Sequence, residues 1–232
     1  VTRCGICGSD LHARHGIDAW AEMADQLGYH RFGRSEQPIV LGHEFCGEVA
    51  EYGPKTRAKV PQGAPVVALP LLRGSTGVDP TGLSQHAPGA YAEQLLVEES
   101  LMLAVPNGLA PEVATLTEPM AVGIYAADLA ALKGGETVVV LGAGAIGLSV
   151  IQAARVAGAV RIWAVDPIQG RCDLARQLGA DQALVTDSAG AVDQIWAETK
   201  RHGPDLIFEC AGENDAVRDA VRMASYDGHV IV

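Results

Sequence analysis

Short runs of hydrophobic residues recur through the second half of the chain, and stretches with helical composition separate them. The runs are rich in Val, Ile and Leu, which is typical of strands buried on both faces of a sheet. The predicted strands cover residues 138–141, 160–165, 184–185, 206–209 and 230–232. Helices are predicted between them at 145–157, 191–199 and 215–224, and an Ala-rich helical segment at 118–132 precedes the first strand. Strands separated by single helices predict an α/β fold with a parallel, doubly wound sheet.

The first half has a different sequence pattern, in which polar segments separate strand-like runs. The strand-like runs are 66–72 and 90–97, and a shorter apolar stretch covers 39–41. Residues 73–89 are rich in Gly, Pro, Ser and Thr and predict a long loop. Apolar residues at rough helical spacing between 15 and 34 predict a short surface helix, or alternatively a wall of a substrate pocket. Near residue 116 the pattern changes from strand-like runs and loops to alternating strands and helices, which predicts two domains, 1–116 and 117–232.

A glycine-rich motif follows the first predicted strand of the second half. It reads Gly142-Ala143-Gly144-Ala145-Ile146-Gly147, which is the pattern G-x-G-x-x-G between a strand and a helix. Gly142 permits a tight turn, Gly144 lets a pyrophosphate approach the backbone, and Gly147 lets the helix pack closely on the strand. The helix N-terminus then offers backbone N–H groups to the phosphates. The motif predicts a dinucleotide site, and the alternative is a purely structural βαβ turn.

An acidic residue, Asp166, ends the next predicted strand. It lies near the expected spacing of about 20 residues for a carboxylate that accepts hydrogen bonds from the adenosine ribose. A carboxylate at that position repels a 2′-phosphate, so the sequence favours NAD over NADP. The alternative is an ordinary surface carboxylate at a strand end.

Composition and charge exclude several classes of partner. The chain has 232 residues, 48% of them hydrophobic, and a formal net charge of −11 at pH 7. The hydrophobic content predicts a substantial core, and the negative charge argues against nucleic acid or an anionic membrane as a partner. The sequence contains neither an apolar run of membrane-spanning length nor a recognisable signal peptide. The 5 cysteines do not have the pattern of a disulfide framework, so we expect a reducing, cytoplasmic setting.

The two ends of the chain indicate a fragment of a longer protein. The chain begins at Val1, close to a cysteine-containing motif and without an initiator Met. It ends at Val232, within the last predicted strand. We therefore expect that segments of the whole protein are missing at both ends.

Two motifs of the first half carry side chains that bind metals or take part in redox chemistry. Cys4 and Cys7 form a C-x-x-C motif, but no βαβ pattern surrounds it, which argues against a thioredoxin-like site. The second motif is Gly42-His43-Glu44. Since a lone Cys is usually a small buried hydrophobe and a lone His is usually structural, these motifs indicate a metal site only in combination.

Taken together, the motifs resemble those of the zinc-dependent medium-chain dehydrogenases, the family of alcohol and polyol dehydrogenases. The matching segments span nearly the whole chain in the family's order: Gly5-Ile6-Cys7-Gly8-Ser9-Asp10-Leu11-His12, Gly42-His43-Glu44 with Gly47 and Gly53, Glu118-Pro119, and Gly142 to Gly147 with Asp166. The resemblance implies a GroES-like β-rich catalytic domain followed by a Rossmann domain.

The resemblance also implies a catalytic zinc ion held by Cys7 and His43. A thiolate and an imidazole suit this borderline-soft ion. The third ligand is Glu118 or Glu44, and the two carboxylates could exchange. Many family members carry four cysteines of a structural zinc lobe, but this chain has no cysteine between Gly47 and Glu118. The expectation is therefore one catalytic zinc and no structural zinc.

The implied reaction is the reversible oxidation of a small-molecule alcohol or polyol to a ketone or aldehyde, with hydride transfer to NAD. By resemblance, Ser9 would accept the substrate proton and His12 would deliver it to solvent, which suits a side chain that titrates near neutral pH. Arg171 would reach the adenosine ribose or its phosphate. The full-length protein is expected to be a homo-oligomer, either a dimer or a tetramer. The alternatives are a catalytically silent NAD-binding sensor and a zinc-free quinone reductase, and the joint presence of the zinc-ligand residues argues against the latter.

Overall fold

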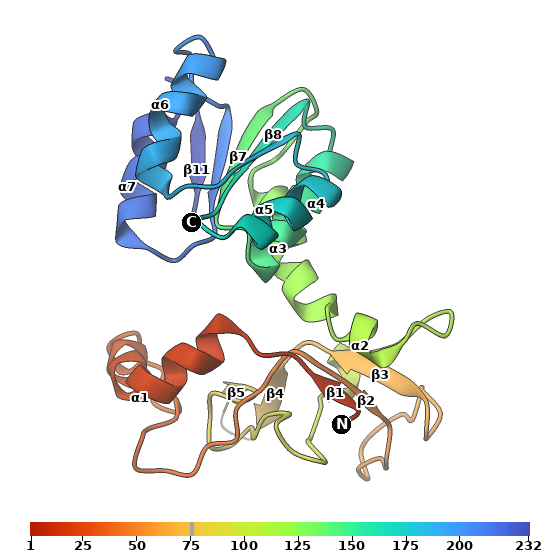
Figure 1. Ribbon diagram of the computed structural model, residues 1–232. Helices are drawn as coiled ribbons and strands as arrows, with labels where there is room; N and C mark the ends of the chain where they lie inside the picture. Colours follow the sequence, from red (N-terminus) through yellow and green to blue (C-terminus); the bar gives the residue numbers. More distant parts are fainter. Residues whose placement is uncertain (75–76) are drawn as a thin grey trace. The chain divides into compact units, whose positions relative to one another are not determined.

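The computed structural model describes residues 1–74 and 77–232, and the chain divides into two compact units, Val1–Glu118 and Pro119–Val232 (Figure 1). The predicted boundary near residue 116 falls close to this division. Each unit has its own sheet and its own buried core.

The second unit is built around a five-stranded sheet in the order β11-β10-β7-β8-β9. Its strands are β7 (Thr137–Leu141), β8 (Arg161–Val165), β9 (Gln182–Leu184), β10 (Leu206–Glu209) and β11 (His229–Ile231). Every pairing between neighbours is parallel, which confirms the predicted doubly wound α/β fold. The strand order reverses between β7 and β10, and such a point is where α/β sheets bind their ligands.

Helices cover both faces of this sheet, because the side chains of each strand alternate between the faces (Figure 1). The helices are α3 (Thr117–Leu129), α4 (Ala145–Val156), α5 (Gln169–Gln177), α6 (Ser188–Glu198) and α7 (Asn214–Met223). Val138 and Val140 pack with α4 and α5. Val139 and Leu141 pack with α6 and α7. All four side chains are almost fully buried, and each contributes about 1.5–3 kcal/mol to stability.

The sequence pattern missed one helix of this unit, α5. Of its residues, only Cys172 and Ala175 are buried, so the apolar stripe is too short to stand out from a polar background. The four predicted helices at 118–132, 145–157, 191–199 and 215–224 correspond to α3, α4, α6 and α7. Their longer apolar faces explain the difference.

The first unit contains a four-stranded antiparallel sheet in the order β1-β2-β3-β6 and a separate hairpin of β4 and β5. Its elements are β1 (Arg3–Cys4), α1 (Gly8–Gln26), β2 (Phe45–Glu48), β3 (Pro65–Ala68), β4 (Leu71–Gly74), β5 (Gly77–Pro80), η1 (Glu99–Leu101), β6 (Met102–Ala104) and α2 (Pro111–Ala114). Its main core gathers around Phe45, Val66 and Met102.

Two expectations for the first unit were wrong. Within the described residues, 90–97 form no regular strand, and residues 89–91 instead hydrogen-bond to the segment 40–42. The predicted loop at 73–89 contains part of the hairpin of β4 and β5, and its residues 75 and 76 lie outside the described residues. Isolated apolar stretches do not reveal which segment will supply a hydrogen-bonding partner, and this explains both errors.

Helix α1 begins at Gly8, well before the stripe of apolar residues that predicted it. Non-helical backbone angles at Gly16 (φ −150°, ψ 28°) interrupt it. The early start matters for function, because it places the residues after Cys7 on the first turn of a helix. In the described part of the chain, no helix combines the length and apolar character that a bilayer crossing requires.

Candidate functional site

Three side chains that could bind a metal converge in the first unit: Cys7, His43 and Glu44. Their candidate ligand atoms are a sulfur, a ring nitrogen and a carboxylate oxygen, and all lie within 4.8 Å of one another. The antiparallel pairing of β1 with β2 brings them together, because it places the residues that follow β1 beside those that precede β2. A backbone hydrogen bond of 2.6 Å from Gly5 N to Glu44 O extends this pairing.

Cys7 and His43 influence each other's ionisation. The hydrogen bond with His43 lowers the pKa of the Cys7 thiol, against the opposing effect of burial. The same contact with Cys7 raises the pKa of His43 to about 9. Near neutral pH the imidazole of His43 is therefore protonated, and its contact favours the thiolate form of Cys7, which is the form of cysteine that binds a metal.

The donor set of this group fits zinc. Zn²⁺ takes thiolate sulfur, imidazole nitrogen and carboxylate oxygen as ligands. Glu44 is 7% exposed, and burial raises the pKa of its carboxyl group. Among the described residues, the buried His43 Nδ1 has no hydrogen-bond partner, although it lies 3.4 Å from Asp10 Oδ1. A divalent cation would compensate the charges that these buried acidic groups concentrate.

Glu118, the other candidate carboxylate, stands apart from this group. It lies in the first turn of α3 and is partly buried. In the described chain it does not belong to the set of ligand atoms within 4.8 Å of one another. Its charge still contributes to the raised pKa of His43, as the smallest of several causes. Glu44 is therefore the nearer candidate, and metal binding by either carboxylate stays a prediction.

The two predicted proton-relay residues lie on α1. Ser9 Oγ is 3.4 Å from His43 Nε2, so this hydroxyl stands beside the candidate metal group. His12 is exposed, and its ring meets Trp20 edge-on with the ring centroids 6.3 Å apart. Since residues three positions apart share a helix face, both side chains project from the same side of α1.

Asp10 is the most buried acidic residue of the site, and the sequence predicts for it a structural role in bonding nearby backbone groups. Its side chain accepts hydrogen bonds from Cys7 N at 3.0 Å and from Gly42 N at 3.1 Å. These bonds tie the start of α1 to the residue before His43. The available signal was the position of Asp10 at the third residue of α1, where an acidic side chain reaches back to the N-cap backbone.

In the second unit, the glycine-rich motif forms the turn between β7 and α4. Gly142 has φ +89°, and a Cβ there would lie 2.8 Å from Ala211 N, in the segment after β10. A Cβ on Gly147 would collide with the carbonyl oxygen of Gly142. Gly144 is the N-cap of α4, and no described side chain caps the helix. The first backbone N–H groups of α4 are thus available to an anion at the point where the strand order reverses.

Asp166 lies directly after β8 and is only 2% exposed. Its carboxylate accepts hydrogen bonds from Ala143 N and Ile168 N, both at 2.9 Å. Arg171 Nη1 lies 3.4 Å from the same carboxylate, and 52% of the Arg171 side chain is exposed. Asp166 therefore supports the glycine turn directly. Contact of either side chain with an adenosine ribose stays a prediction.

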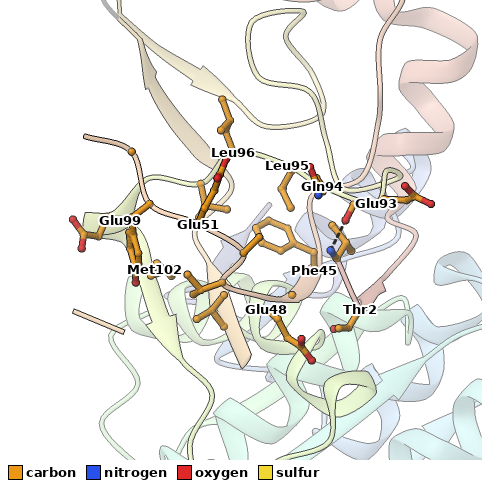
Figure 2. A pocket seen from close by; sticks show the side chains of 18 of the residues that line it. Thr2, Phe45, Glu48, Glu51, Glu93, Gln94, Leu95, Leu96, Glu99 and Met102 are labelled. Atoms are coloured by element: carbon orange, nitrogen blue, oxygen red, sulfur yellow. Dashed lines mark hydrogen bonds between the residues drawn. The ribbon is translucent and has the colours of Figure 1, made fainter. Parts of the chain in front are cut away.

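A cavity of about 680 Å³ lies elsewhere in the first unit, next to β2 (Figure 2). Its walls combine apolar side chains such as Phe45 and Met102 with acidic ones such as Glu48 and Glu51. The candidate metal ligands are not among the described residues that line it. The cavity is therefore distinct from the group of Cys7, His43 and Glu44.

Two family models together match most of the chain. Residues 1–107 match the alcohol dehydrogenase GroES-like domain, and residues 145–232 match the zinc-binding dehydrogenase model. These matches agree with the β-rich first unit and the parallel sheet of the second.

Several known proteins are similar to this chain. (R,R)-butanediol dehydrogenase of Bacillus subtilis is 33% identical over 100% of this chain and 68% of its own length. L-threonine 3-dehydrogenase of Bacillus licheniformis is 30% identical over 100% of this chain and 66% of its own. A crystal structure from Sinorhizobium meliloti 1021, described as a zinc-binding dehydrogenase bound to NADP, has a TM-score of 0.82 and 30% identity over 99% of this chain and 66% of its own. The chain thus spans about two thirds of the length of these relatives.

Proposed function

This chain belongs to the zinc-binding dehydrogenase family, and we propose that it carries the metal and nucleotide sites of an enzyme that oxidises an alcohol or polyol. The product would be a ketone or aldehyde, and the hydride would pass to a nicotinamide dinucleotide. The observation that carries the proposal is the convergence of Cys7, His43 and Glu44 within 4.8 Å. Relatives named for butanediol and L-threonine support a small hydroxyl-bearing substrate.

We assign Cys7, His43 and Glu44 as the residues that hold the zinc ion, with Glu118 as the alternative carboxylate. When bound, zinc would supply a Lewis acid that favours the alkoxide form of the substrate. The lowered pKa of Cys7 supports the assignment, because it favours the deprotonated form that binds a metal. We propose a single zinc for this chain, since the region between Gly47 and Glu118 offers no cysteine for a second, structural site.

The substrate proton needs a route to solvent, and we propose that Ser9 and His12 provide it. Ser9 would take the proton at its Oγ, which lies next to the candidate metal group. His12 would release it, because its exposed imidazole is in contact with water. Their shared face on α1 supports this order of transfer.

For the nucleotide, we propose that the turn from Gly142 to Gly147 receives the pyrophosphate and that NAD is preferred to NADP. Ala145 and Ile146 begin α4 and would supply backbone N–H groups. The negative charge of Asp166 supports the preference, because it would repel a 2′-phosphate. Arg171 lies beside it and would contact the ribose or its phosphate. The NADP-bound relative makes this preference worth measuring directly.

We further propose that the whole protein acts in the cytoplasm as a homo-oligomer, a dimer or a tetramer, with no nucleic-acid or membrane partner. The formal charge of −11 supports the exclusion of polyanionic partners.

The test is a screen of the purified protein for NADH formation with a panel of alcohols, polyols and amino alcohols, with zinc content measured on the same samples. We expect about one zinc per chain and alcohol-dependent NADH formation. A protein that binds NAD and zinc without turning over any alcohol would favour the silent-sensor alternative. A protein that is active without metal would overturn the zinc assignment.

A further inference from the structure

Asp10 forms the centre of a hydrogen-bond network behind the candidate metal ligands. It is 2% exposed. Its Oδ2 accepts from Cys7 N at 3.0 Å, and its Oδ1 accepts from Gly42 N at 3.1 Å. The same Oδ1 lies 3.4 Å from His43 Nδ1. One buried carboxylate therefore contacts the backbone of Cys7 and the ring of His43.

A fourth group completes this network, the hydroxyl of Tyr91. Its oxygen lies 2.9 Å from Asp10 Oδ2 and 3.1 Å from the carbonyl oxygen of Gly5. A phenol has a single proton to donate, and a carboxylate is a stronger acceptor than a neutral carbonyl. The hydroxyl therefore donates to Asp10. Burial and the nearby Asp10 raise the pKa of Tyr91, so the hydroxyl keeps its proton near neutral pH.

The ring of Tyr91 is held in place by the segment that leads to His43. Tyr91 N donates to Leu41 O at 2.9 Å, and Ala90 N donates to Gly42 O at 2.8 Å. Gly42 has φ +96°, and a Cβ there would come within 2.6 Å of Tyr91 Cδ1. The ring thus lies against the bare backbone of Gly42. This packing fixes the direction in which the hydroxyl points.

We propose that Tyr91 is a positioning residue, which acts through Asp10 to hold Cys7 and His43 in the arrangement that binds the metal. The inference rests on the proposed zinc function and adds to it a residue outside the predicted ligand set. A carboxylate offers about four acceptor positions, and Asp10 uses three of them for Cys7 N, Gly42 N and the Tyr91 hydroxyl, with His43 Nδ1 close by. Without the hydroxyl, Oδ2 loses one of its two donors, and the carboxylate is held less firmly beside His43. Partners behind a ligating histidine commonly set the orientation of its ring.

The test is Tyr91→Phe, which keeps the ring against Gly42 and removes only the donor. We expect the affinity for Zn²⁺, measured by competition with a chelating dye, to fall about tenfold. With Co²⁺ in place of zinc, we expect the visible bands of the bound ion to shift, because its ligand geometry changes. The matched control is Tyr52→Phe, which removes a hydroxyl bond to Val60 O in the same unit and should change neither reading.

A double-mutant cycle separates action through Asp10 from a general effect. In an Asp10→Asn background, Tyr91→Phe should cost almost no further affinity. Equal losses in both backgrounds would overturn the proposal, as would a Tyr91→Phe protein that binds metal like the wild type. A Tyr91→Phe protein already unfolded without metal would also overturn it, since the hydroxyl would then serve the fold. If wild-type protein shows no cobalt–thiolate band, the zinc function itself fails and the positioning role falls with it.

Discussion

The two candidate sites are assembled in opposite ways. The glycine turn of the second unit comes from six consecutive residues, Gly142 to Gly147, and its geometry follows from local backbone freedom. The metal group of the first unit joins Cys7 to His43 and Glu44 across a strand pairing. A local site tolerates much change elsewhere, whereas a non-local site depends on every contact that closes the intervening loop. The two sites should therefore fail separately and for different reasons.

The largest expected effect comes from a substitution that disrupts only the metal group of the first unit. Cys7→Ser removes the thiolate, and we expect activity to fall on the order of 10³-fold, which corresponds to several kcal/mol of lost transition-state stabilisation. Zinc content should fall with it. NAD affinity, measured by calorimetry, should stay within a few-fold, because the glycine turn lies in the other unit. A variant that keeps its activity in metal-free buffer would contradict the zinc mechanism.

The second prediction concerns the proton that Cys7 and His43 share. The pKa of His43 is raised from 6.5 to about 9 in the folded protein. The folded state therefore gains its full stabilisation from the protonated imidazole below pH 6.5, and it loses this stabilisation as the pH rises through about 9. The lowered pKa of Cys7 acts in the opposite sense, stabilising above 9.0 and losing its effect as pH falls. Because the two effects have opposite signs, we expect metal-free stability, measured by denaturant unfolding, to fall less between pH 6.5 and 9 than the raised pKa of His43 alone would make it fall.

The pH dependence of the zinc affinity should report on the proton of His43. The metal must displace the proton from the imidazolium, so its affinity should rise roughly tenfold per pH unit between pH 7 and 9 and then level off. Titration calorimetry in buffers of different ionisation enthalpy would count about one proton released per zinc. A pH-independent affinity over that range would contradict a protonated His43 beside Cys7.

A third prediction concerns a substitution that disrupts only the glycine turn of the second unit. Gly147→Ala places a Cβ against the carbonyl oxygen of Gly142. We expect a loss of roughly 1–3 kcal/mol in the free energy of unfolding and at least about tenfold weaker NAD binding, with zinc content unchanged. The control is Gly170→Ala in α5, where the new methyl meets open space and should be neutral or slightly stabilising. Parallel loss of zinc in Gly147→Ala would show that the two sites are not independent.

The smallest predicted effect concerns the choice between NAD and NADP at the glycine turn of the second unit. NAD should bind about tenfold more tightly than NADP, because the unit charge proposed for Asp166 at the ribose site would repel the 2′-phosphate. Arg171→Ala should weaken NADP more than NAD, by a few-fold at most, since an exposed charge contributes little. Equal affinities of the wild type for the two nucleotides would contradict the role given to Asp166.

The predicted parallel α/β fold was confirmed because each strand is a continuous apolar run and all but one of the helices have readable apolar faces. The exception, α5, buries too few residues to leave a pattern. In the first unit the same reasoning failed at 90–97, since this segment is ordered by hydrogen bonds to residues 40–42 and not by its own pattern. The site residues themselves stay predictions, although the structure brings Cys7, His43 and Glu44 together.

By itself the sequence determined the strand–turn–helix around Gly142 to Gly147 and the order of strands and helices that makes the sheet parallel. Those features depend on steric freedom and burial within a few consecutive residues. Only the tertiary structure showed that the carboxylate of Glu44 lies within 4.8 Å of the candidate ligand atoms of Cys7 and His43, and that Asp10 and Tyr91 lie behind these candidate ligands. Contacts of that kind join residues more than 30 positions apart, and no local pattern encodes which distant side chains a folded backbone will bring together.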